Sequence, residues 1–298
     1  MSDNLSTLST ELRNSSTLAL DTMSAKEIVK VINENDKSVA DAVTGALGEI
    51  ARAVRTAADS FKNGGRLIYI GAGTSGRLGV LDASECPPTY SAAPDQVIGL
   101  IAGGRNAMFE AVEGAEDSLT LAAEDLGRLG LSKNDTVVGI AASGRTPYVI
   151  GGLDYSAKLG AKTVALSCVS NAEISAHAAI RIEVVTGAEA VSGSTRMKAG
   201  TAQKMVLNMI STGAFVLTGK VYSNLMVDVR ATNAKLHKRA LRTIRSVIDV
   251  DEDFAEKLLA DSGNSVKTAI VMGKLGCSRA EADEKLREKS GCLRGVIG

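Results

Sequence analysis

The chain has 298 residues, of which 45% are hydrophobic, and its 34 Lys and Arg residues balance 34 Asp and Glu residues to a formal net charge of zero. A chain of this length buries roughly 75% of its unfolded surface, so it needs no disulfide or metal cross-link to fold. The neutral charge argues against a protein that binds the phosphate backbone of nucleic acids. The aromatic content of 3%, with no Trp, argues against a platform that stacks nucleic-acid bases.

The patterns of cysteine, histidine and apolar residues exclude further kinds of site and protein. The four cysteines are dispersed without a CxxC pair, and the chain has two histidines, so we expect neither a metal site nor a redox site. The N-terminus lacks the basic and apolar regions of a signal peptide, and no apolar run reaches the length of a membrane span. The sequence therefore predicts a soluble, cytoplasmic protein that contacts neither a membrane nor nucleic acid.

A polar arm and two helices are predicted at the N-terminus. The arm, residues 1–20, is rich in Ser and Thr. Ser24 and Glu27 have the spacing of a capping box, which predicts a helix start just before the apolar run at residues 28–32. A second helix is predicted over residues 38–61, because apolar side chains recur there at helical spacing, at Val39, Val43, Leu47, Ile50 and Val54.

The middle of the chain alternates short apolar segments with helical stretches. Near-continuous apolar strands that alternate with helices are typical of a parallel sheet covered on both faces. The fold class is therefore α/β, with a parallel five-stranded sheet flanked by helices. The five predicted strands lie at residues 67–70, 97–101, 136–140, 163–166 and 182–185.

The last part of the chain is predicted to be helical. A long helix over roughly residues 196–218 ends near Gly219, and Ser278 and Glu281 form a second capping box. Three short helices are predicted near residues 251–261, 265–275 and 279–289. We divide the chain into an N-terminal arm with helices (1–55), a sheet domain (56–220), a connecting helix (221–249) and a small helical C-terminal unit (250–298).

Three Gly-rich turns that carry hydroxyl groups follow strands of the predicted sheet. Residues 71–76 match the GxGxxG pattern, but the next strand ends without the acidic residue that binds a nucleotide ribose, and no P-loop Lys follows. We therefore expect no nicotinamide cofactor. The alternative for each turn alone is a tight strand-to-helix connection with incidental hydroxyls. Together, the turns favour a monophosphate site made of hydroxyl and N–H donors. The candidate binding residues are Thr74, Ser75, Ser143, Arg145, Thr146, Ser194, Thr195 and Lys198.

Five segments extend this picture to a known family. They are residues 71–77 (GAGTSGR), 81–90 (LDASECPPTY), 111–117 (AVEGAED), 141–147 (AASGRTP) and 193–201 (GSTRMKAGT). In these segments the chain resembles the N-acetylmuramic acid 6-phosphate etherases, which have the sugar isomerase (SIS) fold. The resemblance extends over nearly the whole chain. It implies an SIS-type sheet domain over residues 56–220 and a sugar-phosphate substrate.

The resemblance also implies a reaction. The family removes D-lactate from N-acetylmuramic acid 6-phosphate and leaves N-acetylglucosamine 6-phosphate. The ether is on carbon 3, which is β to the aldehyde of the open-chain sugar. A base removes the proton on carbon 2, an acid protonates the departing lactate oxygen, and water adds to the unsaturated aldehyde. Each positioned proton-transfer group contributes roughly 10²–10⁴-fold, and no metal or redox cofactor is required.

By resemblance, Glu85 and Glu116 are the two catalytic positions. We assign Glu85 as the acid toward lactate and Glu116 as the base at carbon 2. The alternative for each is a solvated helix charge, the commonest environment of Glu. Glu113 is the competing residue, because it lies three residues before Glu116 on the same face of a helix predicted over residues 111–121. We expect it to be a supporting residue.

Two further residues and the assembly complete the predictions. His237 is a candidate for assisting ring opening, from its own or a partner subunit, and a structural or exposed histidine is the alternative. Cys86 adjoins the proposed acid, but the chemistry needs no thiol, so we expect it to pack in the core. A homodimer is expected from the resemblance.

Two other functions are compatible with an SIS domain. One is a non-catalytic sugar-phosphate sensor similar to the animal glucokinase regulatory protein, although that protein has two SIS domains and is much longer. The other is an aldose–ketose isomerase, which needs one proton shuttle between adjacent carbons. The pair Glu85 and Glu116 favours the lyase over both.

Overall fold

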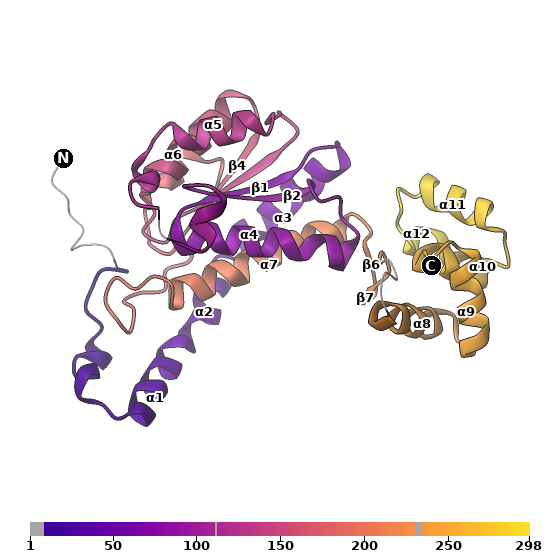
Figure 1. Ribbon diagram of the computed structural model, residues 1–298, viewed down its shortest axis with the longest axis horizontal. Helices are drawn as coiled ribbons and strands as arrows, with labels where there is room; N and C mark the ends of the chain where they lie inside the picture. Colours follow the sequence, from indigo (N-terminus) through magenta and orange to yellow (C-terminus); the bar gives the residue numbers. More distant parts are fainter. Residues whose placement is uncertain (1–8, 111, 230–233) are drawn as a thin grey trace. The chain divides into compact units, whose positions relative to one another are not determined.

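The computed structural model of the protein describes residues 9–110, 112–229 and 234–298 (Figure 1). The chain divides into two compact units, one made of residues 1–84 and 95–211, the other of residues 85–94 and 212–298. Two helices, α4 (Gly73–Tyr90) and α7 (Lys198–Leu217), contribute to both units. Within the described residues, no helix combines the length and apolar character that a membrane span requires.

The first unit is built on a five-stranded parallel sheet in the order β2-β1-β3-β4-β5, which confirms the predicted fold class. Its strands are β1 (Leu67–Gly71), β2 (Val97–Ile101), β3 (Thr136–Ile140), β4 (Lys162–Ser167) and β5 (Ile180–Glu183). The prediction for the last strand is wrong by two residues. The strand ends at Glu183, whose carboxylate accepts the backbone N–H groups of Asn171 and Ala172, and Val185 is exposed.

Helices cover both faces of the sheet. All residues of β1 and β3 are buried, as their near-continuous apolar sequence predicts. On one face, α5 (Leu121–Arg128) and α6 (Pro147–Lys158) share a core cluster with Ile68, Ile70 and Val137. On the other face lie α3 (Leu47–Lys62), whose Ser60 hydroxyl bonds that of Thr136, and α4 (Figure 1).

The N-terminal helices differ in part from the prediction. The capping box of Ser24 and Glu27 is present at the start of α1 (Ala25–Asp36). The single helix predicted over residues 38–61 is wrong, because α2 (Ser38–Thr44) ends before α3 begins at Leu47. Between them Ala46 has non-helical backbone angles of φ −104° and ψ 2°. Because of this break Ala46 enters the core, while Leu47 is 47% exposed.

The second unit has its own helical core. Its helices are α8 (Ala234–Ile248), α9 (Glu252–Asp261), α10 (Val266–Leu275), α11 (Arg279–Glu288) and α12 (Arg294–Ile297), and a hairpin is formed by β6 (Val221–Tyr222) and β7 (Leu225–Met226). Ile244, Leu259 and Ile270, from three of these helices, are fully buried together. The three predicted short helices are confirmed as α9, α10 and α11, and the second capping box is present at Ser278.

Asp135 joins the beginnings of β1 and β3 and carries a prediction about stability. The residue is 1% exposed, and its carboxylate accepts the backbone N–H groups of Arg66 and Ser132 and Nη2 of Arg66, each at 2.8 Å. We expect Asp135→Asn to lower the free energy of unfolding at pH 7 by about 1.5–3 kcal/mol, the range for a hydrogen bond that involves a charged group. Urea denaturation of the wild type and the variant measures the difference.

The same carboxylate gives this difference a pH dependence. Burial by itself would raise the pKa of Asp135, but hydrogen bonds from Arg66 and from the Ser132 N–H outweigh it and lower the pKa. A carboxyl with a lowered folded pKa stabilises the fold above its unfolded pKa of about 3.9, and this contribution is lost as the pH falls through the folded value. The difference between wild type and variant should therefore shrink below about pH 4. A difference that stays constant from pH 7 to pH 3 would contradict the role of the charge.

Candidate active site

The strand order places two hydroxyl-rich turns at the same edge of the sheet. In the order 2-1-3-4-5 all strands are parallel, but the chain adds β2 on one side of β1 and β3 on the other, so the strand order reverses between β1 and β3. Ligands of open α/β sheets bind beyond the carboxyl ends of the strands at such a point. The last residues of the two strands, Gly71 and Ile140, are register partners. The turns that follow them, residues 72–76 and 141–146, therefore lie side by side.

The first of these turns requires glycine because two backbone segments approach closely. A Cβ atom on Gly76 would lie 2.6 Å from the carbonyl oxygen of Gly71. This tight turn starts α4, with Thr74 half-buried and Ser75 7% exposed in its first turn. The N–H groups of a first helical turn have no intrahelical acceptor, which makes this position suitable for an anion.

The second turn, residues 141–146, leads into α6. Gly144 has a φ of +72°, and its carbonyl oxygen accepts the N–H of Ile174, which fixes the turn against the loop after β4. Pro147 occupies the first position of α6, as the sequence predicts. Ser143, Arg145 and Thr146 are all half-buried around this helix start.

The third turn lies elsewhere than expected. It begins at Ser192, well after the end of β5 at Glu183, and not at a strand end. Ser194 and Thr195 are half-buried, and the N–H of Gly193 donates to the carbonyl of Thr10 in the N-terminal arm at 3.4 Å. The N-terminal arm therefore contacts this turn, and α7 begins shortly after it, at Lys198.

A buried carboxylate caps the start of α7, and the sequence did not reveal it. Glu189 is 0% exposed and accepts the N–H groups of Lys198 and Ala199, both at 2.9 Å. Because this carboxylate already occupies the N-terminus of α7, an anion has better access to the N-termini of α4 and α6. Lys198 itself is buried.

The first turns of α4 and α7 are in contact. The Ser75 hydroxyl donates to Oε1 of Gln203 at 3.0 Å, and a Cβ atom on Gly200 would lie 3.6 Å from the methyl group of Thr74. The structure thus brings Thr74 and Ser75 next to the segment that carries the third turn. Gln203 is a residue that sequence reasoning missed, because a single glutamine inside a helix carries no motif.

Glu116 lies on a short 3-10 helix rather than on the predicted helix over residues 111–121. That element, η5 (Ala115–Asp117), follows Gly114, which has a left-handed φ of +75°. Ala111 lies outside the described residues, and Glu113 does not share a helix face with Glu116. Ala115 packs against the core cluster of α5 and α6, and η5 contacts α6. The exposed Glu116 side chain therefore lies on η5, and η5 packs against α6, the helix that follows the second turn.

Glu85 is exposed on α4, one turn beyond a buried acidic residue. That residue, Asp82, accepts hydrogen bonds from the Tyr69 hydroxyl at 2.8 Å, from Asn208 at 2.7 Å and from Ser211 at 3.2 Å. These contacts attach α4 to β1 and α7 and fix the helix just before Glu85. Along α4, Glu85 lies ten residues beyond Ser75, which is about 15 Å of helical rise.

His237 has an acidic partner within the second unit. It lies on α8, and its Nε2 is 2.9 Å from a carboxylate oxygen of Glu256 on α9. The carboxylate orients the imidazole ring. Among the predicted site residues, Glu85 and His237 belong to the second unit, whereas Glu116 and the hydroxyl-rich turns belong to the first.

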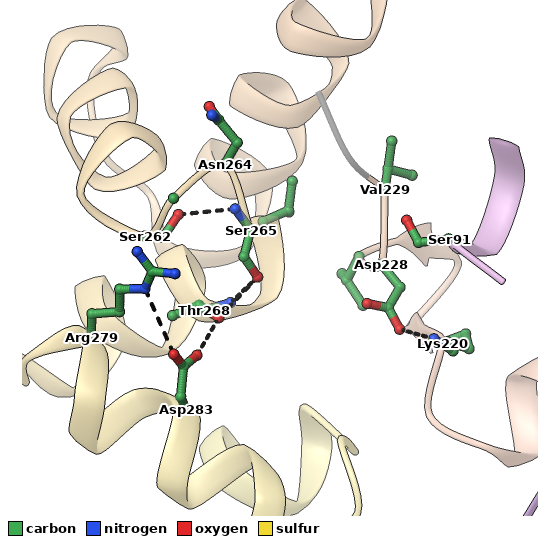
Figure 2. Close-up of a pocket in the computed structure, with 13 residues that line it drawn as sticks. Ser91, Lys220, Asp228, Val229, Ser262, Asn264, Ser265, Thr268, Arg279 and Asp283 are labelled. Atoms are coloured by element: carbon green, nitrogen blue, oxygen red, sulfur yellow. Dashed lines mark hydrogen bonds and ion pairs between the residues drawn. The ribbon is translucent and has the colours of Figure 1, made fainter. Parts of the chain in front are cut away.

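The second unit also contains a cavity of about 530 Å³ (Figure 2). Its charged groups are already paired. Asp228 bonds Lys220 at 2.8 Å, and Asp283 accepts from Thr268 at 2.8 Å and lies 3.7 Å from Arg279. The predicted site residues do not line this cavity. We therefore place the candidate active site at the sheet edge and not here.

The cysteines are in no disulfide, and Cys86 is buried as expected. Burial, and then the charge of Glu189, raise the pKa of the Cys168 thiol to about 12, so this thiol is protonated and unreactive at neutral pH. Among the described residues, no group of three or more His, Cys, Asp and Glu side chains is arranged to hold a metal ion.

Comparison with known proteins identifies the family of this fold. A model described as the glucokinase regulatory protein N-terminal SIS domain matches residues 49–157, and a model described as the SIS domain matches residues 118–212. Among solved structures, a phosphoheptose isomerase from Francisella tularensis superposes with a TM-score of 0.53 at 17% identity, covering 65% of this chain and 100% of that chain. At this identity the likeness shows the SIS-type fold alone.

Curated relatives are much more similar. The N-acetylmuramic acid 6-phosphate etherase of Listeria welshimeri is 56% identical over 293 residues, which cover 98% of this chain and 99% of that protein. The relative of the same name from a Geobacillus species matches to the same extent, 56% over 293 residues. An identity of this size along almost the whole chain confirms the resemblance seen in the five segments, and the chain belongs to the family of N-acetylmuramic acid 6-phosphate etherases.

Proposed function

We propose that the protein cleaves the D-lactyl ether of N-acetylmuramic acid 6-phosphate to give N-acetylglucosamine 6-phosphate and D-lactate, and is thus a carbon–oxygen lyase. The observation that carries the proposal is the 56% identity, over 98% of the chain, to proteins named for this activity. The paired turns at the carboxyl ends of β1 and β3 support it, because they form a site of the kind that a sugar phosphate requires.

The phosphate binds, in this proposal, at the starts of α4 and α6. Both helix starts direct backbone N–H groups and a positive dipole end toward the sheet edge. Thr74 and Ser75 supply hydroxyls from one side, and Ser143, Arg145 and Thr146 supply hydroxyls and a cation from the other. Ser194, Thr195 and Lys198, at the start of α7, are proposed to contact the sugar next to them.

The reaction is an elimination followed by an addition. Glu116 removes the proton on carbon 2, α to the aldehyde of the open-chain sugar, and the electron pair expels the lactate oxygen from carbon 3. Glu85 protonates that oxygen as it leaves, and the same carboxylate then takes a proton from the water that adds to carbon 3. His237, oriented by Glu256, is the proposed aid to ring opening. The protein's side chains catalyse these steps by proton transfer alone, and we propose no cofactor.

The proposed assembly is a homodimer, as the resemblance to the etherase family leads us to expect. We propose that a second copy of the chain supplies Glu85, as symmetric dimers with shared sites do.

The proposed setting is the cytoplasm, in amino-sugar catabolism and the recycling of cell-wall peptidoglycan. A phosphorylated sugar carries charge that a bilayer does not pass, so the substrate stays in the compartment where it was phosphorylated. An enzyme for it acts in that compartment.

Ser143→Ala tests the phosphate site. Loss of one donor to a charged group costs about 1.5–3 kcal/mol, so we expect the Michaelis constant to rise roughly 10- to 150-fold with little change in stability. Steady-state kinetics and thermal unfolding measure the two effects. Ser15→Ala, at an exposed position of the N-terminal arm, is the matched control and should behave like the wild type. An unchanged Michaelis constant in Ser143→Ala would place the phosphate elsewhere.

Incubation of the purified protein with N-acetylmuramic acid 6-phosphate, with an assay for D-lactate, tests the function itself. We expect stoichiometric release of D-lactate and N-acetylglucosamine 6-phosphate. The unphosphorylated sugar should be a poor substrate, because it lacks the group that the two turns bind. Tight binding of the phosphate sugar without lactate release would instead indicate a sensor, and a ketose product would indicate an isomerase.

A further inference from the structure

An unusual buried amide lies directly behind the first hydroxyl-rich turn. Gln203 on α7 is 1% exposed, and its Oε1 accepts the hydroxyl proton of Ser75 at 3.0 Å. Its Nε2 is buried without a hydrogen-bond partner among the described residues. An unmade hydrogen bond of a buried donor is costly, and native proteins rarely retain one without a reason.

The direction of this hydrogen bond bears on the phosphate site. A serine hydroxyl has one proton. With that proton directed to Oε1 of Gln203, Ser75 has no proton to offer a phosphate, which is an acceptor. Rotation of the amide by half a turn exchanges oxygen and nitrogen at almost the same positions. Nε2 then donates to Oγ of Ser75, and the Ser75 proton becomes available.

We propose that Gln203 is a positioning residue for the phosphate site: when substrate binds, its amide donates to Ser75, and Ser75 donates its proton to a phosphate oxygen. The chain of donors runs from Nε2 through Oγ to the phosphate, and such chains strengthen each bond by polarisation. The rotated amide also gives its N–H a partner. This inference rests on the proposed sugar-phosphate site, but not on the identity of the reaction.

Two variants of nearly the same size separate the proposal from simple packing. In Gln203→Glu the side chain is an ionised acceptor, so it retains the Ser75 proton and repels the phosphate. In Gln203→Met the side chain fills the space but makes no strong hydrogen bond. We expect the Michaelis constant to rise about 10- to 150-fold for Gln203→Glu and less than tenfold for Gln203→Met, with kcat little changed in both.

Lower pH should restore sugar-phosphate binding in Gln203→Glu but not in Gln203→Met. Burial raises the pKa of a carboxyl, and a protonated Glu has an O–H donor in place of the amide donor. The ratio of the dissociation constants of Gln203→Glu and wild type for N-acetylglucosamine 6-phosphate, measured by calorimetry, should fall as the pH is lowered from 7.5 to 5.5. Taking the ratio at each pH removes the titration of the phosphate itself, and the ratio for Gln203→Met should stay constant.

The outcomes distinguish this inference from the proposed function. Equal weakening in Gln203→Glu and Gln203→Met, or no rescue at low pH, would show that the side chain only packs, even if the wild type releases lactate. If the wild type binds the sugar phosphate but releases no lactate, the function fails and the calorimetric comparison still applies. Should Gln203→Glu not fold, Gln203→Met is compared in the wild-type and Ser75→Ala backgrounds. An equal effect in both backgrounds would overturn the proposal, because the amide is inferred to act through Ser75.

Discussion

Glu116→Gln is expected to reduce lactate release by at least the roughly 10²–10⁴-fold that a positioned general base contributes. The variant should also lose the exchange of the carbon 2 proton with solvent deuterium, because the amide cannot accept that proton. Folding should be unaffected, since Glu116 is exposed on η5 and its amide is nearly isosteric. Coupled assays of D-lactate and NMR observation of carbon 2 measure the two effects.

Two control variants isolate the role of Glu116. Glu124→Gln removes an exposed carboxylate from α5, where it pairs with Arg128, and should keep wild-type activity. Glu113→Gln tests the competing residue, which Gly114 separates from η5. Loss of carbon 2 exchange in Glu113→Gln, with exchange retained in Glu116→Gln, would transfer the role of base to Glu113.

Glu85→Gln is expected to block net lactate release by a similar factor of about 10²–10⁴ while carbon 2 exchange continues. Exchange requires only the enolate, whereas cleavage requires a proton for the leaving oxygen. If the exchange pattern of Glu85→Gln and Glu116→Gln is reversed, the roles of acid and base are reversed as well.

Mixing the two inactive variants tests whether a site uses two chains. When Glu85→Gln and Glu116→Gln subunits are exchanged at random, half of the dimers contain one of each, and each mixed dimer has one intact site if Glu85 comes from the partner. About a quarter of wild-type activity should then return. If every site is built within one chain, the mixture should remain inactive.

Much of the fold could be predicted because its causes are local or periodic. The central strands β1 and β3 are runs of apolar residues buried on both faces, and the capping boxes at Ser24 and Ser278 depend on residues three positions apart. The hydroxyl-rich turns after β1 and β3 could be found in the same way. They occupy the expected end of the sheet because parallel strands all point in one direction.

The predicted helix bounds are wrong where tertiary contacts determine whether the helix continues. The apolar spacing of residues 38–61 continues through Gly45, but packing selects Ala46 over Leu47 for the core and breaks the helix. The stretch before α5 has acidic residues at helical spacing, yet Gly114 adopts a left-handed conformation and reduces the helix to the single turn of η5. Propensity alone does not predict such choices.

The supporting residues of the site could not be found from one sequence. Gln203 bonds a residue 128 positions away, and Asn208 bonds Asp82 across 126 positions. Glu189 caps α7 from a loop with no motif of its own. In each case the side chain matters because of what the fold places beside it, and no spacing in the sequence indicates that neighbour.

Product analysis after reaction in D₂O tests the central claim most directly. Elimination and addition require the carbon 2 proton to leave and to be replaced from solvent, so N-acetylglucosamine 6-phosphate formed by the wild type should carry deuterium at carbon 2. In water enriched in ¹⁸O, the new hydroxyl on carbon 3 should carry the label, and the released D-lactate should not. D-lactate release that leaves carbon 2 fully protonated, or that labels the lactate oxygen, would contradict the elimination mechanism and the assigned role of Glu116.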